Sequence, residues 1–176
     1  MIILFNKPFN VLCQFTDREG RKTISDYVKI KNVYAAGRLD YDSEGLVILT
    51  DDGKLQKLIS DPEHKLDKTY WVQVEGIPSE ESFNKLRKGI LIRDGLTKPA
   101  KVKLINAPRI TERNPPIRER KNIPTSWMEL IITEGKNSQV RRMTAAIGHP
   151  TLRLIRYSIG DWTLENLKPG EYKSFR

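Results

Sequence analysis

The chain contains a single cysteine, Cys13, among its 176 residues. One cysteine excludes an internal disulfide and favours a reducing compartment, and its apolar neighbours in VLCQF predict a small buried side chain. No run of about 18 apolar residues is present, so no membrane-spanning helix is expected. The apolar start, MIILF, is too short for a signal peptide, and no cleavage pattern follows it. These features together predict a cytoplasmic protein.

Several kinds of chemistry lack the residues they need. His64 and His149 lie far apart, and with one cysteine they do not make a zinc site of the usual ligands. The segment TEGKNS has one glycine where a phosphate-binding loop needs the frame Gly-x-x-x-x-Gly-Lys. A Ser-His-Asp triad has no credible nucleophile elbow. The sequence therefore predicts neither a zinc site, nor a nucleoside-triphosphate site, nor a serine hydrolase.

Positive charge is in excess, with 31 Lys and Arg against 22 Asp and Glu and a formal net charge of +9. Such an excess favours a polyanion as partner, nucleic acid being the commonest. The cations gather in two segments, a connection at 107–126 with four prolines and a later stretch at 134–156. The first holds Arg109, Arg113, Arg118, Arg120 and Lys121, and the second holds Lys136, Arg141, Arg142, Arg153 and Arg156. We expect Arg118, Arg120, Lys136, Arg142 and Arg153 to bind RNA, although any single arginine also fits a solvated surface.

Charged side chains stand directly before an apolar run in GRLDYDSEGLVILTDDG, residues 37–53. Arg38 and Asp40 are two residues apart, so an extended backbone points both to the same side. A nearby arginine keeps an aspartate ionised at neutral pH, and such an aspartate can act as a nucleophile. Taken alone, Asp40 also fits an ordinary surface carboxylate. Arg38 lies among the carboxylates, which disfavours a Mg²⁺ site, and Asp42 and Glu44 fit turn contacts.

The pattern of apolar residues predicts a mixed α+β fold, with a mostly antiparallel sheet flanked by helices. We expect a single domain over residues 1–176, with the basic, proline-rich insert at 107–126. Expected strands cover 2–5, 11–15, 33–36, 46–50, 68–76, 90–93, 100–106, 126–133 and 151–159, and expected helices lie within 23–28, 54–60, 78–89 and 137–148. The dipeptide Asp52-Gly53 is typical of a turn.

The segment at 37–53 resembles the signature of the pseudouridine synthases, specifically the group that modifies ribosomal RNA in bacteria. Three further segments match motifs of that family in its order: NKP at 6–8, KTYWVQVEG at 68–76 and EGKNSQVRRM at 134–143. RNPPIRER and IPTSW, in and after the insert, are similar to members that act on large-subunit ribosomal RNA. The ordered set spans nearly the whole chain.

This resemblance implies a two-lobed, monomeric isomerase that converts uridine to pseudouridine in ribosomal RNA without a cofactor or a metal. It implies that Asp40 is the catalytic aspartate, that Arg141 pairs with it, and that Tyr70 stacks on the target base. Arg38 would help to hold the uridine out of its helix. Asp40 would attack C6 of the base or C1′ of the sugar, or abstract a proton from C2′. Many relatives carry a small RNA-binding domain before the first motif, and we expect none here.

Two other functions fit the same residues. A non-catalytic protein that binds ribosomal RNA would need the basic clusters alone, and replacing Asp40 would leave its function intact. A metal-dependent nuclease would use the carboxylates, shorten the RNA and stop working in a chelator. Taken alone, Tyr70 fits core packing and Arg141 fits an ion pair on a helix surface.

Overall fold

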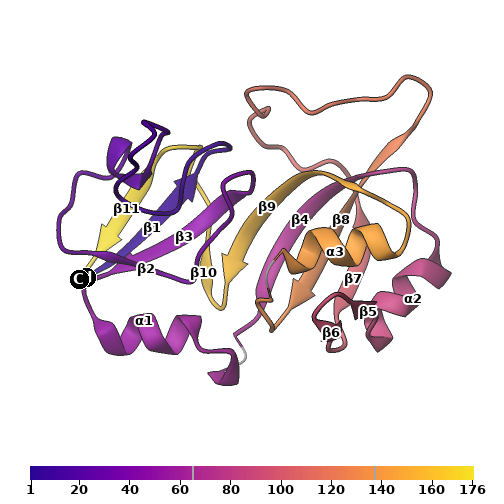
Figure 1. The fold of residues 1–176 in the computed structure, drawn as a ribbon, viewed down its shortest axis with the longest axis horizontal. Coiled ribbons are helices and arrows are strands. Elements are labelled where there is room, and N and C mark those ends of the chain that lie inside the picture. The colour runs from indigo at the N-terminus through magenta and orange to yellow at the C-terminus, as the bar shows by residue number, and fades with distance from the viewer. Residues whose placement is uncertain (65, 137) are drawn as a thin grey trace. The chain divides into compact units, whose positions relative to one another are not determined.

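The computed structural model describes residues 1–64, 66–136 and 138–176. The chain forms two compact units, whose helices and strands are labelled in Figure 1. Unit 1 comprises Met1–Leu66 together with Ile155–Arg176, and unit 2 comprises Asp67–Leu154. Strand β9 (Thr151–Ile159) begins in unit 2 and ends in unit 1. Within the described residues, every helix is too short or too polar to cross a membrane.

Unit 1 is built around strand β3 (Glu44–Thr50), whose seven residues are all buried. It pairs antiparallel with β1 (Ile2–Lys7) and with β2 (Tyr34–Ala36), and parallel with β9 at Glu44 and Gly45. Strand β11 (Tyr172–Phe175) extends the sheet beyond β1, and β10 (Trp162–Thr163) pairs with the end of β9. The unit also holds helix α1 (Gly53–Ser60) and the short 3-10 turns η1 (Ile24–Asp26) and η2 (Pro62–His64).

Unit 2 contains antiparallel strands in the order β4 (Lys68–Glu75), β8 (Thr125–Ile132) and β7 (Lys101–Ile105), and β9 is the other neighbour of β4 in the sheet. Helices α2 (Glu80–Lys88) and α3 (Gln139–Ala146) pack on it, and a short hairpin joins β5 (Leu91–Ile92) to β6 (Gly95–Leu96). The core of this unit combines apolar side chains of the sheet and of both helices. Burying these faces supplies most of the free energy that holds helices of eight or nine residues in place.

The expected fold class is confirmed, since in the described residues three α-helices accompany a mostly antiparallel sheet. Alternation on β4 is also as expected, with Tyr70, Val72 and Val74 buried. In α2, Ser79 accepts a hydrogen bond from the Ser82 amide, and Gly89 ends the helix. Asn137, included in the helix expected at 137–148, lies outside the described residues.

Two expectations about local structure are wrong. Residues 11–15 do not form a strand: they make one isolated bridge, between Leu12 and Thr23. Val11 and Cys13 are buried, so the apolar run reflects burial in unit 1 without pairing along a neighbouring strand. Asp52-Gly53 is not a simple turn, because Asp52 caps α1 by accepting hydrogen bonds from the Lys54 and Leu55 amides. Aspartate suits a turn and an N-cap equally, because its carboxylate accepts from nearby amides in both.

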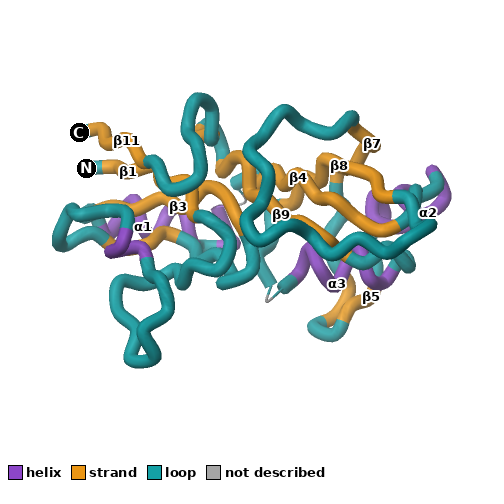
Figure 2. Tube along the Cα trace, turned by 90° about the horizontal axis from the view of Figure 1, so that it is seen from above, coloured by secondary structure: helices purple, strands orange, loops and turns teal. Residues whose placement is uncertain are grey.

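The proline-rich connection between β7 and β8 contains neither helix nor strand in residues 106–124, all of which the structure describes (Figure 2). Its backbone is nevertheless held at two points. Arg113 donates to the carbonyl oxygen of Leu152 at 3.1 Å, and Arg153 donates to the carbonyl oxygen of Thr111 at 2.8 Å. Two arginines therefore tie this loop to the start of β9.

Candidate active site

The loop at residues 37–43, between β2 and β3, presents Arg38 and Asp40 to solvent. Leu39 between them is 6% exposed and belongs to the core of unit 1. An extended backbone alternates its side chains, so burying Leu39 turns both neighbours outward. The Ser43 amide donates to the Asp40 carbonyl oxygen at 3.0 Å and tightens the turn. The expectation that Arg38 and Asp40 point to one side is consistent with this arrangement.

A buried arginine supports the backbone of this loop. Arg156, on the part of β9 in unit 1, is 3% exposed. Its Nε donates to the carbonyl oxygen of Leu46 at 2.9 Å, and its Nη1 donates to that of Arg38 at 3.4 Å. One guanidinium therefore binds both the strand β3 and the loop that precedes it. The Arg38 side chain lies 3.5 Å from the Gln14 amide oxygen, its acceptor.

A buried lysine supports the same loop from β1. Lys7 is fully buried, and its Nζ donates to the carbonyl oxygens of Pro8 at 2.9 Å, Val11 at 2.8 Å and Tyr41 at 3.3 Å. Tyr41 follows Asp40 directly in the chain. Burying a charged ammonium is costly unless it is hydrogen-bonded, and here three carbonyl oxygens accept its three N–H groups. Lys7 therefore joins the first motif of the sequence to the loop that carries Asp40.

Burial lowers the pKa of Lys7 from its usual 10.5 to about 8, against the opposing attraction of Glu44, Asp42 and Asp40. Between pH 8 and 10.5 the unfolded chain then binds more protons than the folded one, so the Lys7 contribution to stability rises with pH. We expect the difference in free energy of unfolding between the native protein and Lys7→Met to grow by about 2 kcal/mol from pH 7.5 to 9.5. Urea unfolding of both proteins at each pH measures it, and a difference that stays constant would contradict the lowered pKa.

Tyr70 and Arg141 lie in unit 2. Tyr70, on β4, is 8% exposed and packs in one hydrophobic cluster with Val140 and Met143 of α3. Arg141 is the third residue of α3 and is partly buried. The shared cluster holds the ring of Tyr70 and the helix that carries Arg141 in a constant arrangement. The structure thus brings Tyr70 and the Arg141 helix together in unit 2, and Arg38 and Asp40 together in unit 1.

The cations expected to bind RNA differ in how accessible they are. Arg118 is exposed, and Arg120 is exposed beside Glu75, with 3.6 Å between Nε and the carboxylate. Arg142 pairs with Asp94 at 3.1 Å, and Lys136 Nζ lies 3.8 Å from the Glu134 carboxylate. Arg153 is 7% exposed and binds the backbone of the 106–124 loop, so its side chain supports that loop directly. Its expected contact with RNA stays a prediction.

Four structural contributions were missed by the sequence reasoning. Lys7 and Arg156 support the Asp40 loop, and Glu134 and Gln139 form a buried pair at the start of α3. Lys7 and Arg156 bind main-chain carbonyl oxygens, which have no signature in sequence. Glu134 and Gln139 both stand in EGKNSQVRRM, so their motif was visible although their contact was not. Among the described residues, no three His, Cys, Asp or Glu side chains gather into a group that could hold a metal ion.

Comparisons with known proteins identify the family. The family model described as RNA pseudouridylate synthase matches residues 1–146. The ribosomal large subunit pseudouridine synthase E of Vibrio parahaemolyticus is 60% identical, with 99% of this chain and 74% of that protein covered. The protein of the same name from Xanthomonas axonopodis pv. citri is 55% identical, with 96% and 90% covered. A crystal structure of a pseudouridylate synthase, 32% identical, superposes with a TM-score of 0.81 over 99% of this chain and 70% of that one. The chain belongs to the RNA pseudouridylate synthase family.

Proposed function

We propose that this protein converts a uridine of large-subunit ribosomal RNA to pseudouridine, acting as a monomer in the cytoplasm with Asp40 as its catalytic carboxylate. The names of relatives at 60% and 55% identity support the large subunit as the source of the substrate. The observation that carries the role of Asp40 is its exposure on a loop whose backbone two buried cations bind, Lys7 and Arg156. A carboxylate held at a constant position can act on a bound substrate without first being ordered.

The isomerisation conserves the atoms of the nucleoside apart from one proton lost and one gained. The bond from N1 of uracil to C1′ of ribose breaks, C5 bonds to C1′, the hydrogen on C5 leaves as a proton, and N1 takes one up. No electrons leave the nucleoside, so the balance needs no redox partner. Asp40 would start the reaction by attacking C6 or C1′, or by removing the C2′ proton.

The remaining site residues have roles that base flipping requires. A base inside a helix cannot be reached, so the enzyme must take it out of the stack. Arg38, exposed two residues before Asp40, would brace the vacated position. Tyr70 would offer an aromatic surface to the base, and the pairing of Arg141 with Asp40 that the resemblance implies stays a prediction.

Release of tritium from ribosomal RNA labelled at C5 of uracil tests the reaction, because the new bond at C5 must expel that hydrogen. We expect release by the native protein, unchanged by a chelator, with the RNA chain kept at full length. Chelator-sensitive shortening of the RNA would indicate a nuclease. Binding without release, on naked RNA and on ribosomal particles alike, would indicate a protein that only binds ribosomal RNA.

We also propose that the 106–124 loop positions the RNA. Arg153 donates to the carbonyl oxygen of Thr111 in this loop, and Arg113 donates to those of Pro115 and Pro116. These contacts hold the backbone, so that Arg109, Arg118 and Lys121 stand exposed on an ordered support. Cations fixed beforehand lose less conformational entropy when they bind phosphate.

Replacing Arg118 and Arg120 by glutamine should weaken binding of ribosomal RNA about tenfold near 0.1 M salt, because two phosphate contacts disappear. The slope of log affinity against log salt should fall by about 1.5. The matched control is Lys101→Gln with Lys103→Gln, which removes the same charge from exposed positions of β7. Filter binding across a salt series measures both pairs, and equal losses would show that only net charge matters.

A further inference from the structure

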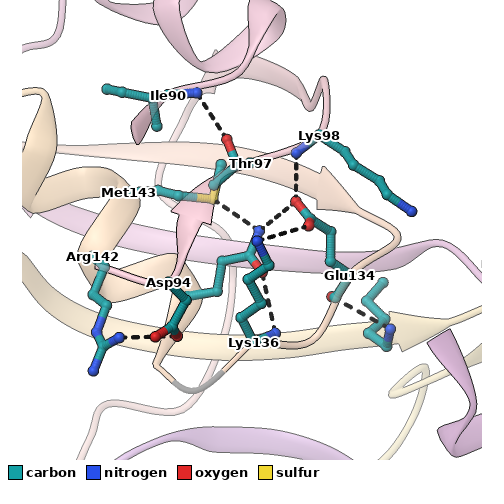
Figure 3. A network of polar contacts seen from close by, with 10 residues as sticks. Ile90, Asp94, Thr97, Lys98, Glu134, Lys136, Arg142 and Met143 are labelled. Carbon is teal, nitrogen blue, oxygen red and sulfur yellow. Dashed lines mark hydrogen bonds and ion pairs between the residues drawn. The ribbon is translucent and has the colours of Figure 1, made fainter. Parts of the chain in front are cut away.

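A buried polar network joins the end of β8 to the first turn of α3 (Figure 3). Glu134 is 8% exposed and Gln139, the first residue of α3, is 3% exposed. Glu134 Oε1 accepts from the Gln139 side-chain amide at 2.9 Å and from the Lys98 backbone amide at 2.6 Å. A carboxylate is therefore buried between the segment that joins β6 to β7 and the helix that carries Arg141.

Gln139 uses both ends of its side-chain amide. Its Oε1 accepts from the Lys136 backbone amide at 3.2 Å, while Nε2 also lies 3.6 Å from Sδ of Met143, one helical turn further on. The Gln139 backbone amide donates in turn to the Lys136 carbonyl oxygen at 3.1 Å. Both backbone groups of Lys136, its amide and its carbonyl, are therefore hydrogen-bonded to Gln139 at the start of α3.

These two hydrogen bonds hold a backbone conformation that serine does not favour. Ser138, directly before α3, has φ of 50°, in the left-handed region that side chains other than glycine rarely adopt. A residue in that region persists where its surroundings hold it in place. The Arg142 amide, which donates to the Ser138 carbonyl oxygen at 3.1 Å, depends on this conformation for the first hydrogen bond of the helix.

We propose that Glu134 and Gln139 are positioning residues that fix the first turn of α3 and so place Arg141 for the reaction; this inference rests on the proposed function. Arg141 follows Gln139 by two positions, which a helix separates by more than half a turn. The buried face of the turn thus carries Gln139, and the partly exposed face carries Arg141. A carboxylate bound to a backbone amide and a side-chain amide allows one arrangement of that turn, whereas apolar packing alone would allow several.

Gln139→Glu tests the proposal, because it removes the amide donor to Glu134 and places a second carboxylate against it. We expect the single-turnover rate constant at pH 8 to fall about 100-fold, the loss that a displacement of about 1 Å can cause, with RNA affinity within about threefold of native. Repulsion between the two carboxylates raises the pKa of the pair, against the opposing charge of Lys136, whose Nζ lies 3.8 Å from Glu134, so that lowering the pH adds a proton for the two to share. The variant should therefore regain activity, relative to the native protein, as the pH falls from 8 to 5.5, and a helix that is merely unstable would not recover in this way.

The exchanged variant Glu134→Gln with Gln139→Glu restores one carboxylate and one amide, and we expect it to recover most of the lost rate. Glu129→Gln is the control for the Glu134→Gln half of that exchange: it makes the same chemical change on β8, at a residue whose partner is the exposed Lys103, and should stay within about twofold of native. Hydrogen exchange at the Arg142 amide should accelerate in Gln139→Glu alone.

A folded Gln139→Glu protein with the native rate constant would overturn the inference, and so would a loss confined to RNA affinity. The native protein is measured in the same assay. If it releases no tritium, the proposed function fails; if it does and Gln139→Glu equals it, only the positioning role fails.

Discussion

Asp40→Asn should abolish pseudouridine formation, lowering the single-turnover rate constant by about 10⁴-fold or more. Asparagine keeps the shape of the side chain and removes the charge, so it can neither attack carbon nor take up a proton as a carboxylate does. Asp40 is exposed and Leu39 before it is buried, so the backbone of the loop does not depend on this carboxylate for its core packing. The variant should therefore fold and bind ribosomal RNA as the native protein does.

Asp42→Asn is the matched control for Asp40→Asn. Asp42 is also exposed and lies two residues further along the same loop, so its replacement makes an equal change in net charge next to Lys7. We expect its rate constant to stay within about threefold of native. Tritium release under single turnover, with the enzyme in excess of both the RNA and the dissociation constant, compares all three proteins. Equal losses at both positions would mean that the charge of the loop matters and that Asp40 is not the catalytic carboxylate.

The parts of the fold that follow from sequence are those whose signals are local. Strand β4 alternates buried Tyr70, Val72 and Val74 with less buried neighbours, and α2 has its cap and its glycine stop in the expected places. The run at residues 11–15 is equally apolar, but whether it pairs depends on which strand lies alongside. In this fold it forms one bridge, between Leu12 and Thr23. Periodicity reports burial, and only the topology decides whether a buried segment becomes a strand.

The residues of the site divide in the same way, into those with a local signal in sequence and those whose partners are set by the fold. The resemblance led to Arg38, Asp40, Tyr70 and Arg141, because their motifs are short and contiguous. It did not reveal that Lys7 and Arg156 are buried beneath the Asp40 loop, where both bind carbonyl oxygens. Every residue has a carbonyl group, so such partners leave no trace in composition or spacing. Likewise the sequence does not show that the Arg153 guanidinium binds the Thr111 carbonyl oxygen, and its expected contact with RNA stays a prediction.

The glycine at position 45 shows how closely the backbone of β9 approaches the end of the Asp40 loop. Gly45 pairs with Arg156 across the parallel β3–β9 contact, at a φ of 116°. A Cβ there would lie 2.3 Å from the Arg156 carbonyl oxygen and 2.6 Å from its amide nitrogen. Both atoms belong to backbone, so no side chain can move aside to make room.

Gly45→Ala should therefore lower the free energy of unfolding by about 4 kcal/mol, since it adds backbone strain to a steric overlap. Gly37→Ala is its control: Gly37 has a φ of 79°, and a Cβ there would meet no atom within 4 Å. Strain alone should then lower the free energy of unfolding by about 1–2 kcal/mol. Urea unfolding measures the free energy of unfolding of both variants, and equal losses would mean that β3 and β9 separate readily at Gly45.

If β3 and β9 stay paired at Gly45, the added Cβ displaces Arg156, and this displacement must also disturb the carbonyl groups of Arg38 and Leu46 that Arg156 binds. Activity should then fall in Gly45→Ala even where the protein remains folded, because the strand contact and the support of Asp40 share one arginine.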